Sequence, residues 1–209
     1  MTTDPLLKMS GVSKRFPGVV ALDRVDFHVA AGEIVGLVGE NGAGKSTLMK
    51  ILGGIHRADS GEIAIDGAPV VMHGPADAGR LGIGMIHQEL ELVDTLDAAA
   101  NVFLGREPHR AGPLRLLDRR RMDADAATQL ARVGAAFPPH TPVRRVSTAQ
   151  RRLVAIARAL SMNARLLVLD EPTASLGSSE AERLFAVLRD LQSSGTAIVY
   201  VSHRLKEIE

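Results

Sequence analysis

The stretch GENGAGKST, residues 39–47, decides the fold. Its glycines and the lysine and hydroxyl residues that follow them fit the spacing G-x-x-x-x-G-K-[S/T]. Glycine lets backbone N–H groups converge on an anion without a Cβ in the way. An apolar run, EIVGLVG (33–39), precedes the stretch, and a helical pattern, KSTLMKILGG (45–54), follows it. We therefore predict a phosphate-binding loop between a buried strand and a helix whose N-terminus adds positive potential.

The side chains of this loop, a P-loop, have distinct predicted roles. The amino group of Lys45 reaches the β- and γ-phosphates of a nucleotide, and the hydroxyl of Ser46 ligates Mg²⁺. A chance match to the pattern in a chain of this composition is on the order of one in a hundred, and the strand–loop–helix context favours the P-loop over a plain glycine-rich turn. The residues expected to hold ATP here are Gly39, Asn41, Gly42, Gly44, Lys45, Ser46 and Thr47.

A second strand end supplies acids to the same chemistry. In LLVLDEPT, Asp170 ends an apolar run and is expected to hold Mg²⁺, and Glu171 follows it. A carboxylate beside the nucleotide orients and deprotonates a water molecule that attacks the γ-phosphate. Because adjacent strand residues point in opposite directions, the chain must turn at Pro172 if both carboxylates are to face the nucleotide.

Strands and helices alternate at both ends of the chain. Residues 6–36 are β-rich, and helices are predicted at 97–104, 118–135 and 151–161, with a further helix opened by a capping box from Ser179 to Glu182. The pattern predicts an α/β fold. We expect one domain over 1–209: a P-loop core with a mixed, largely parallel sheet and an N-terminal antiparallel β subdomain (1–88 and 160–209), and an inserted α-helical subdomain (89–159).

Composition excludes several classes of protein. The 209 residues carry a net charge of +1, so no global field favours nucleic acid or an anionic membrane. There is no cysteine, no signal peptide and no apolar run of membrane-spanning length, so the expected compartment is the cytoplasm. Residues 106–165 hold thirteen arginines against four acids. This excess is either a solvated helical surface or a basic subdomain that meets acidic partners or phosphates.

Taken together, the motifs resemble those of an ATP-binding-cassette (ABC) ATPase over nearly the whole chain, from about Leu6 to Glu209. The segments that carry the resemblance, in family order, are KRFPGVVAL, GENGAGKST, IHQEL, VSTAQRRLVAIARAL, LLVLDEPTASL and VYVSHRL. The resemblance implies that Phe16 stacks on adenine, that Gln88 senses Mg²⁺ and the attacking water, and that His203 contacts the γ-phosphate. It also implies that Glu171 is the catalytic base and that Asp170 binds Mg²⁺.

The signature segment VSTAQ implies a partner. Ser147 and Gln150 stand at the start of a helix, which is a second anion site. In the family, the signature of one ATPase domain closes over ATP held by a second domain, head to tail, in a homodimer or in the tandem half of one chain. Two departures from the family pattern stand out: Thr148 and Ala149 replace the glycines of L-S-G-G-Q, and Gly177 replaces the aspartate of S-A-L-D.

Longer stretches, including IHQELELVDTLDAAANVFLGRE, resemble the sugar-import branch (ribose, xylose and galactose type). The resemblance implies an ATP-hydrolysing subunit on the cytoplasmic face of the inner membrane, contacting permease subunits through residues 88–107 and, indirectly, a periplasmic or extracellular sugar-binding protein. The chain is expected to be the truncated first half of a tandem protein. An exporter remains an alternative, as does a soluble ATPase of DNA repair or translation, although Phe137 is the one aromatic residue in the basic stretch.

Overall fold

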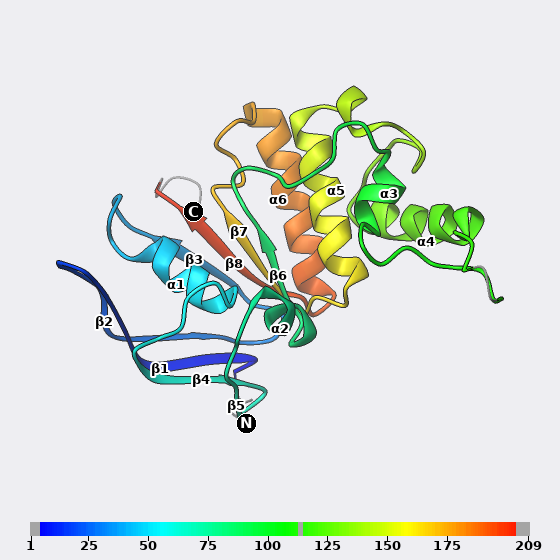
Figure 1. The fold of residues 1–209 in the computed structure, drawn as a ribbon. Helices are drawn as coiled ribbons and strands as arrows, with labels where there is room; N and C mark the ends of the chain where they lie inside the picture. Colours follow the sequence, from blue (N-terminus) through cyan, green and yellow to red (C-terminus); the bar gives the residue numbers. More distant parts are fainter. Residues whose placement is uncertain (1–4, 113–114, 204–209) are drawn as a thin grey trace.

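Two sheets organise the computed structural model, which describes residues 5–112 and 115–203 (Figure 1). The first sheet is antiparallel in the order β2-β1-β4-β5, with strands β1 Leu7–Phe16, β2 Val19–Val29, β4 Ser60–Ile65 and β5 Ala68–Pro69. The second is parallel in the order β3-β8-β7-β6, with strands β3 Ile34–Val38, β8 Ala197–Ser202, β7 Leu166–Asp170 and β6 Ile83–Ile86. The predicted α/β class and the separation into an antiparallel and a parallel sheet are confirmed.

The central strands β7 and β8 are buried on both faces, which explains their continuous apolar sequences. Alternate residues point to two different cores. One core lies toward α1 (Lys45–Leu52) and the antiparallel sheet and takes Leu166, Val168, Ala197, Val199 and Val201. The other lies toward the helices and takes Leu167, Leu169, Ile198 and Tyr200.

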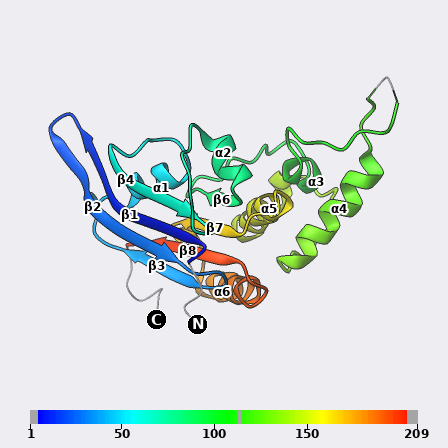
Figure 2. The ribbon, with the colours of Figure 1, turned by 90° about the horizontal axis from the view of Figure 1, so that it is seen from below.

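The remaining helices are α2 Pro75–Arg80, α3 Ala98–Val102, α4 Arg119–Arg132, the 3₁₀ turn η1 Val143–Arg145, α5 Thr148–Ser161 and α6 Ser178–Ser193. Figure 2 shows α3 and α4 beyond α5, at the end of the molecule away from the antiparallel sheet. The predicted face of α4 is buried: Met122, Ala126, Leu130 and Val133. Helices α3, α4 and α5 pack against one another; the division into a core and an inserted subdomain at residues 89–159 stays a prediction.

Three local predictions are wrong. The helix predicted at 151–161 begins at Thr148, because a capping box formed by Ser147 and Gln150 completes an earlier first turn. Helix α6 begins after Gly177, whose N–H donates to the Glu180 carboxylate at 3.3 Å, so the expected Ser179–Glu182 box does not form. Strand β3 is at the edge of the parallel sheet, pairing among the described residues with β8 alone, so it is not the fully buried strand predicted.

Candidate functional site

The carboxyl ends of the parallel strands place the predicted motifs along one edge of the sheet. The register pairs residues at the carboxyl ends of neighbouring strands, each the last or next-to-last of its strand: Val38 with Ser202, Asp170 with Val201, and Leu169 with Ile86. The P-loop follows β3 directly, Glu171 follows β7, His203 follows β8, and Gln88 stands two residues beyond β6. Four separate segments of the sequence therefore meet at one edge, where ligands bind in open parallel sheets.

The P-loop has a backbone that glycine makes possible. Gly42 and Gly44 have φ angles of 90° and 87°, in the left-handed region that L-residues rarely adopt. A Cβ on Gly44 would lie 2.6 Å from the carbonyl oxygen of Ala21 in β2, so side chains are also excluded by space. The Nζ of Lys45 donates to the carbonyl oxygens of Gly39 at 2.6 Å and Glu40 at 2.9 Å. The lysine thus crosses the loop it belongs to.

Helix α1 begins at the end of this loop, with Gly44 as its N-cap. Because glycine has no side chain, nothing at the N-cap fills the space beside the first N–H groups of the helix. Ser46 is exposed in the first turn, Thr47 is half-buried, and Asn41 is exposed on the loop. The arrangement offers backbone donors, a helix N-terminus and a hydroxyl to an anion.

Asp170 is a half-buried carboxyl group with too little positive charge around it. Burial raises its pKa, and the neighbouring charge of Glu171 raises it further, while His87 and Lys45 act in the opposite direction. The influence of Lys45 shows that the P-loop lysine and this acid share one electrostatic environment. A divalent cation would relieve the penalty. The hard oxygens of Asp170 and Ser46 suit Mg²⁺, which binds through one or two protein oxygens together with phosphate.

Glu171 adopts a strained backbone conformation and forms a pair with His203. Its φ angle is 45°, a left-handed value that costs on the order of 1–3 kcal/mol for a non-glycine residue. Its N–H donates to the carbonyl oxygen of Val201 at 2.9 Å, which fixes the turn. The sequence placed this turn at Pro172; it occurs one residue earlier. His203 Nδ1 lies 2.8 Å from Glu171 Oε1, so the imidazole N–H donates to the carboxylate.

The other predicted residues lie around these. Gln88 is exposed. Phe16 ends β1, is 37% exposed, and meets His56 edge to face with ring centroids 5.3 Å apart. The hairpin that carries Phe16 continues into β2, against whose Ala21 the P-loop packs.

Ser147 and Gln150 cap their own helix instead of contacting the P-loop of the same chain. The Oγ of Ser147 accepts from the Gln150 N–H at 3.3 Å, and the Gln150 Oε1 accepts from the Ser147 N–H at 3.0 Å. Thr148 and Ala149, which replace two family glycines, lie in the first turn of α5 with right-handed helical backbone. The replacement therefore creates no backbone strain in this arrangement.

Several relevant residues escaped the sequence analysis. Arg152 is 2% exposed in α5, and its Nε and Nη1 have no hydrogen-bond partner among the described residues. The sequence held one sign of this burial, because Arg152 stands four residues before the buried Ile156 on the same side of the helix. The charge of the arginine argued against a buried position. Thr173 hydrogen-bonds the Tyr200 hydroxyl at 2.9 Å, tying the loop after Glu171 to β8. His87, next to Gln88, contributes to the field at Asp170.

None of the helices within residues 5–112 and 115–203 is long and apolar enough to cross a membrane.

Comparison with known proteins agrees with this architecture. Residues 22–174 match the ABC transporter family. A ribose import ATP-binding protein of Streptomyces avermitilis is 52% identical over 205 residues, which are 98% of this chain and 39% of that protein. A putative ribose/galactose/methyl galactoside import ATP-binding protein of Burkholderia cenocepacia is 49% identical over 208 residues, 99% of this chain and 40% of that protein. The chain thus spans about 40% of the length of these relatives.

Solved structures give the same result. An ATP-binding cassette of an ABC transporter in its ADP conformation superimposes with a TM-score of 0.86 at 25% identity, covering 99% of this chain and 84% of that one. The dimeric structure of a bacterial ABC transporter cassette gives 0.77 at 26% identity, covering 96% and 89%. The family match covers most of the sequence, the relatives are about 50% identical, and the structure has a strand-end site built on a P-loop. This chain therefore belongs to the ABC transporter family, as one of its ATP-binding cassettes.

Proposed function

We propose that the protein is the ATP-binding and ATP-hydrolysing subunit of an ABC importer for a monosaccharide. The observation that supports this most strongly is the convergence of the P-loop, Asp170, Glu171 and His203 at one edge of the parallel sheet. The names of the relatives, which refer to ribose and galactose import, support the sugar as cargo. The choice of sugar is expected to lie in the permease and the external binding protein, because the cargo does not pass through this subunit.

The nucleotide site works as follows. The triphosphate lies in the P-loop, where Lys45 exchanges the carbonyl oxygens of Gly39 and Glu40 for phosphate oxygens. Ser46 and Asp170 would hold Mg²⁺, and the ion would supply positive charge against the phosphates. Phe16 stacks on the adenine. Gln88, in the loop after β6, would sense the metal and the attacking water.

Glu171 acts as the base. Its carboxylate accepts a proton from the water that attacks the γ-phosphorus, while the bond to the β-phosphate oxygen breaks and ADP leaves. The left-handed backbone at Glu171 and the bond from His203 hold the carboxylate in one orientation. His203 thereby positions the base and stands beside the γ-phosphate. A carboxylate that is already oriented needs no reorganisation during the reaction, and this benefit offsets the cost of the strained backbone at Glu171.

A second ATPase domain completes each site. Ser147 and Gln150 at the N-terminus of α5 cover ATP that is bound by the partner domain, in a head-to-tail arrangement formed by a tandem half or a second copy. The dimeric cassettes among the solved structures support this assembly. To accept a phosphate, the Ser147–Gln150 capping box opens and the freed groups turn to the partner's nucleotide. Closure on ATP and reopening after hydrolysis drive the permease.

The subunit works on the cytoplasmic side of the inner membrane, as a peripheral protein bound to permease subunits. Residues 88–107 make that contact, and the sugar-binding protein outside the membrane acts through the permease.

The substitution Glu171→Gln tests the chemistry. It removes the base but keeps the shape of the side chain, so ATP binding should persist while turnover falls by at least about a hundredfold. Binding is measured by calorimetry and turnover by phosphate release. Glu182→Gln is the matched control, since Glu182 is exposed on α6, and it should change neither quantity. Hydrolysis that survives in Glu171→Gln would show that another group is the base.

A further inference from the structure

The end of strand β1, which carries Phe16, has less support from its own sheet than the rest of the strand. In the pairing of β1 with β4, the last partners are Ser13 and Ser60. Beyond that point Lys14, Arg15 and Phe16 pair, among the described residues, with β2 alone, and the register shifts between Lys14 and Arg15. A two-stranded ribbon is marginally stable by itself. The position of Phe16 therefore depends on contacts from outside the hairpin.

Asp59 supplies these contacts. Its Oδ1 accepts from Lys14 Nζ at 2.6 Å, and its Oδ2 accepts from the Arg15 N–H at 2.7 Å. Its own N–H donates to the Ser13 carbonyl oxygen at 2.9 Å. The hydrogen bond from Lys14 lowers the pKa of Asp59, and the bond from the Arg15 N–H lowers it further. One charged aspartate thus binds three consecutive residues at the end of β1.

Two side chains of this region contact the ring of Phe16. The Lys14 ammonium group, which Asp59 holds, lies over the ring at 5.6 Å from its centroid. The imidazole of His56 meets the ring at an interplanar angle of 66°, with the centroids 5.3 Å apart. His56 is half-buried, whereas Phe16 is exposed, so the ring is packed on one part of its surface and accessible on another. An accessible aromatic ring that is fixed by its neighbours suits a flat base.

The segment that carries His56 and Asp59 is anchored to the helix that begins at the P-loop. The N–H groups of Ile55 and His56 donate to the Lys50 carbonyl oxygen of α1 at 2.8 and 3.0 Å. Helix α1 is eight residues long and buries its apolar side chains. At the other end of α1 the P-loop packs against Ala21 of β2, in the same hairpin as Phe16. The phosphate-binding loop and the Phe16 ring are therefore joined through α1, His56 and Asp59.

We propose that Asp59 and His56 are positioning residues for the nucleotide base: they hold Phe16 at the distance from the P-loop at which its ring stacks on adenine. The inference rests on the proposed function, which supplies ATP as the ligand and Phe16 as its base contact. Base–aromatic stacking contributes about ten- to a hundredfold to affinity, so a displaced ring weakens ATP binding. The groups that the P-loop offers to the phosphates do not include Asp59 or His56, so the chemical step is unaffected once ATP is bound.

The test compares ATP with inorganic tripolyphosphate, which has three linked phosphates and no base. Calorimetry with Mg²⁺ measures the dissociation constant of each ligand, and phosphate release measures turnover. Asp59→Ala should weaken ATP binding by about tenfold. It should change tripolyphosphate binding, and turnover at saturating ATP, by less than about twofold, because neither depends on the base. Asp59→Asn should weaken ATP binding by about threefold, because its amide oxygen still accepts from the Arg15 N–H.

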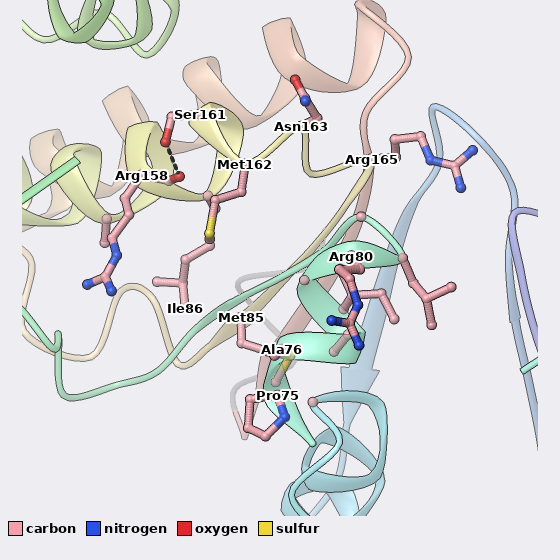
Figure 3. A pocket seen from close by; sticks show the side chains of 18 of the residues that line it. Pro75, Ala76, Arg80, Met85, Ile86, Arg158, Ser161, Met162, Asn163 and Arg165 are labelled. Atoms are coloured by element: carbon pink, nitrogen blue, oxygen red, sulfur yellow. Dashed lines mark hydrogen bonds between the residues drawn. The ribbon is translucent and has the colours of Figure 1, made fainter. Parts of the chain in front are cut away.

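Asp66→Asn is the matched control for Asp59→Asn. Asp66 forms an ion pair with Arg165 at 2.7 Å, similar to the 2.6 Å pair of Asp59 with Lys14. Its left-handed backbone, with φ at 51°, accepts asparagine. Arg165 lines the open cavity that Figure 3 shows, and Phe16 is not part of that lining. Loss of this exposed ion pair should change ATP binding by less than about twofold.

His56 provides a second pair of variants, which does not depend on the ion pair. His56→Ala removes the ring contact and should weaken ATP binding by about threefold. His56→Phe keeps an aromatic ring against Phe16 and should stay within about twofold of the wild type. Tripolyphosphate binding should be the same in both variants. If His56→Ala binds ATP as tightly as the wild type, the role assigned to His56 is wrong.

A double-mutant cycle with Phe16→Ala separates this inference from the proposed function. If the wild-type protein does not bind and hydrolyse Mg-ATP, the proposed function fails. If Phe16→Ala weakens ATP binding and Asp59→Ala does not, the positioning proposal alone is overturned. It is also overturned if Asp59→Ala weakens ATP and tripolyphosphate binding equally, since Asp59 then acts on the whole fold. In the Phe16→Ala background, Asp59→Ala should cause no further loss of ATP affinity.

Discussion

The P-loop and the signature segment each stand at a helix N-terminus that we propose to bind an anion, but they are built differently. At the P-loop, Gly44 leaves the first turn of α1 open, the backbone takes left-handed angles that side chains disfavour, and a Cβ on Gly44 would meet the Ala21 carbonyl oxygen. At the signature segment, the Ser147 Oγ accepts from the Gln150 N–H, the Gln150 Oε1 accepts from the Ser147 N–H, and Thr148 and Ala149 have ordinary helical geometry. The first site is preorganised for phosphate, while the second must release its own cap.

This difference predicts which substitutions each segment tolerates. Glycine is required where φ is positive and a carbonyl oxygen lies close, which is the situation at Gly44. It is not required at positions 148 and 149, where the backbone is helical. The family's glycines at the signature segment can therefore be replaced in this chain without the backbone cost that the same change would cause in the P-loop.

The largest expected effect comes from Gly44→Ala. The new Cβ would meet the Ala21 carbonyl oxygen and adopt a disfavoured φ, so we expect a loss of about 3 kcal/mol of stability or more. ATP binding should be lost with it. Gly42→Ala is the graded control, because that residue has a similar φ but no atom within 4 Å of the place that a Cβ would take; it should cost about 1–2 kcal/mol. Chemical denaturation measures both, and equal costs would show that space at Gly44 is irrelevant.

A smaller effect is expected from Ser147→Ala. Loss of an N-cap hydroxyl costs about 1 kcal/mol, which lowers the melting temperature by roughly 2–4 °C in a chain of this size. Thr148→Ala, one residue further along, removes an exposed hydroxyl that takes no part in the capping box and should leave the melting temperature unchanged. Thermal unfolding followed by circular dichroism checks both. If Ser147→Ala melts with the wild type, the capping box contributes nothing and the contrast with the P-loop disappears.

Much of the fold was predictable because its signals are local. The P-loop glycines, the acids after an apolar run, and the helical spacing of Met122, Ala126 and Leu130 depend on neighbours in sequence. They predicted the α/β class, the motifs and the buried face of α4.

The features that were missed depend on tertiary structure. An apolar run does not show whether a strand is central or at an edge, which is why β3 was placed wrongly. The turn at Glu171 depends on its bond to Val201, thirty residues away in sequence. The burial of Arg152 depends on which elements pack together. The charge excess of residues 106–165 did not distinguish Arg152 from the exposed arginines.

Calorimetric titration of ATP into the wild-type protein, with and without Mg²⁺, tests the central claim most directly: the P-loop and the strand-end acids form one magnesium–triphosphate site. We expect saturable binding of one ATP per chain in the presence of Mg²⁺, and binding at least about tenfold weaker when Mg²⁺ is removed, because Asp170 then faces the phosphates without a cation between them. Absence of binding under both conditions, or binding that Mg²⁺ leaves unchanged, would contradict the account.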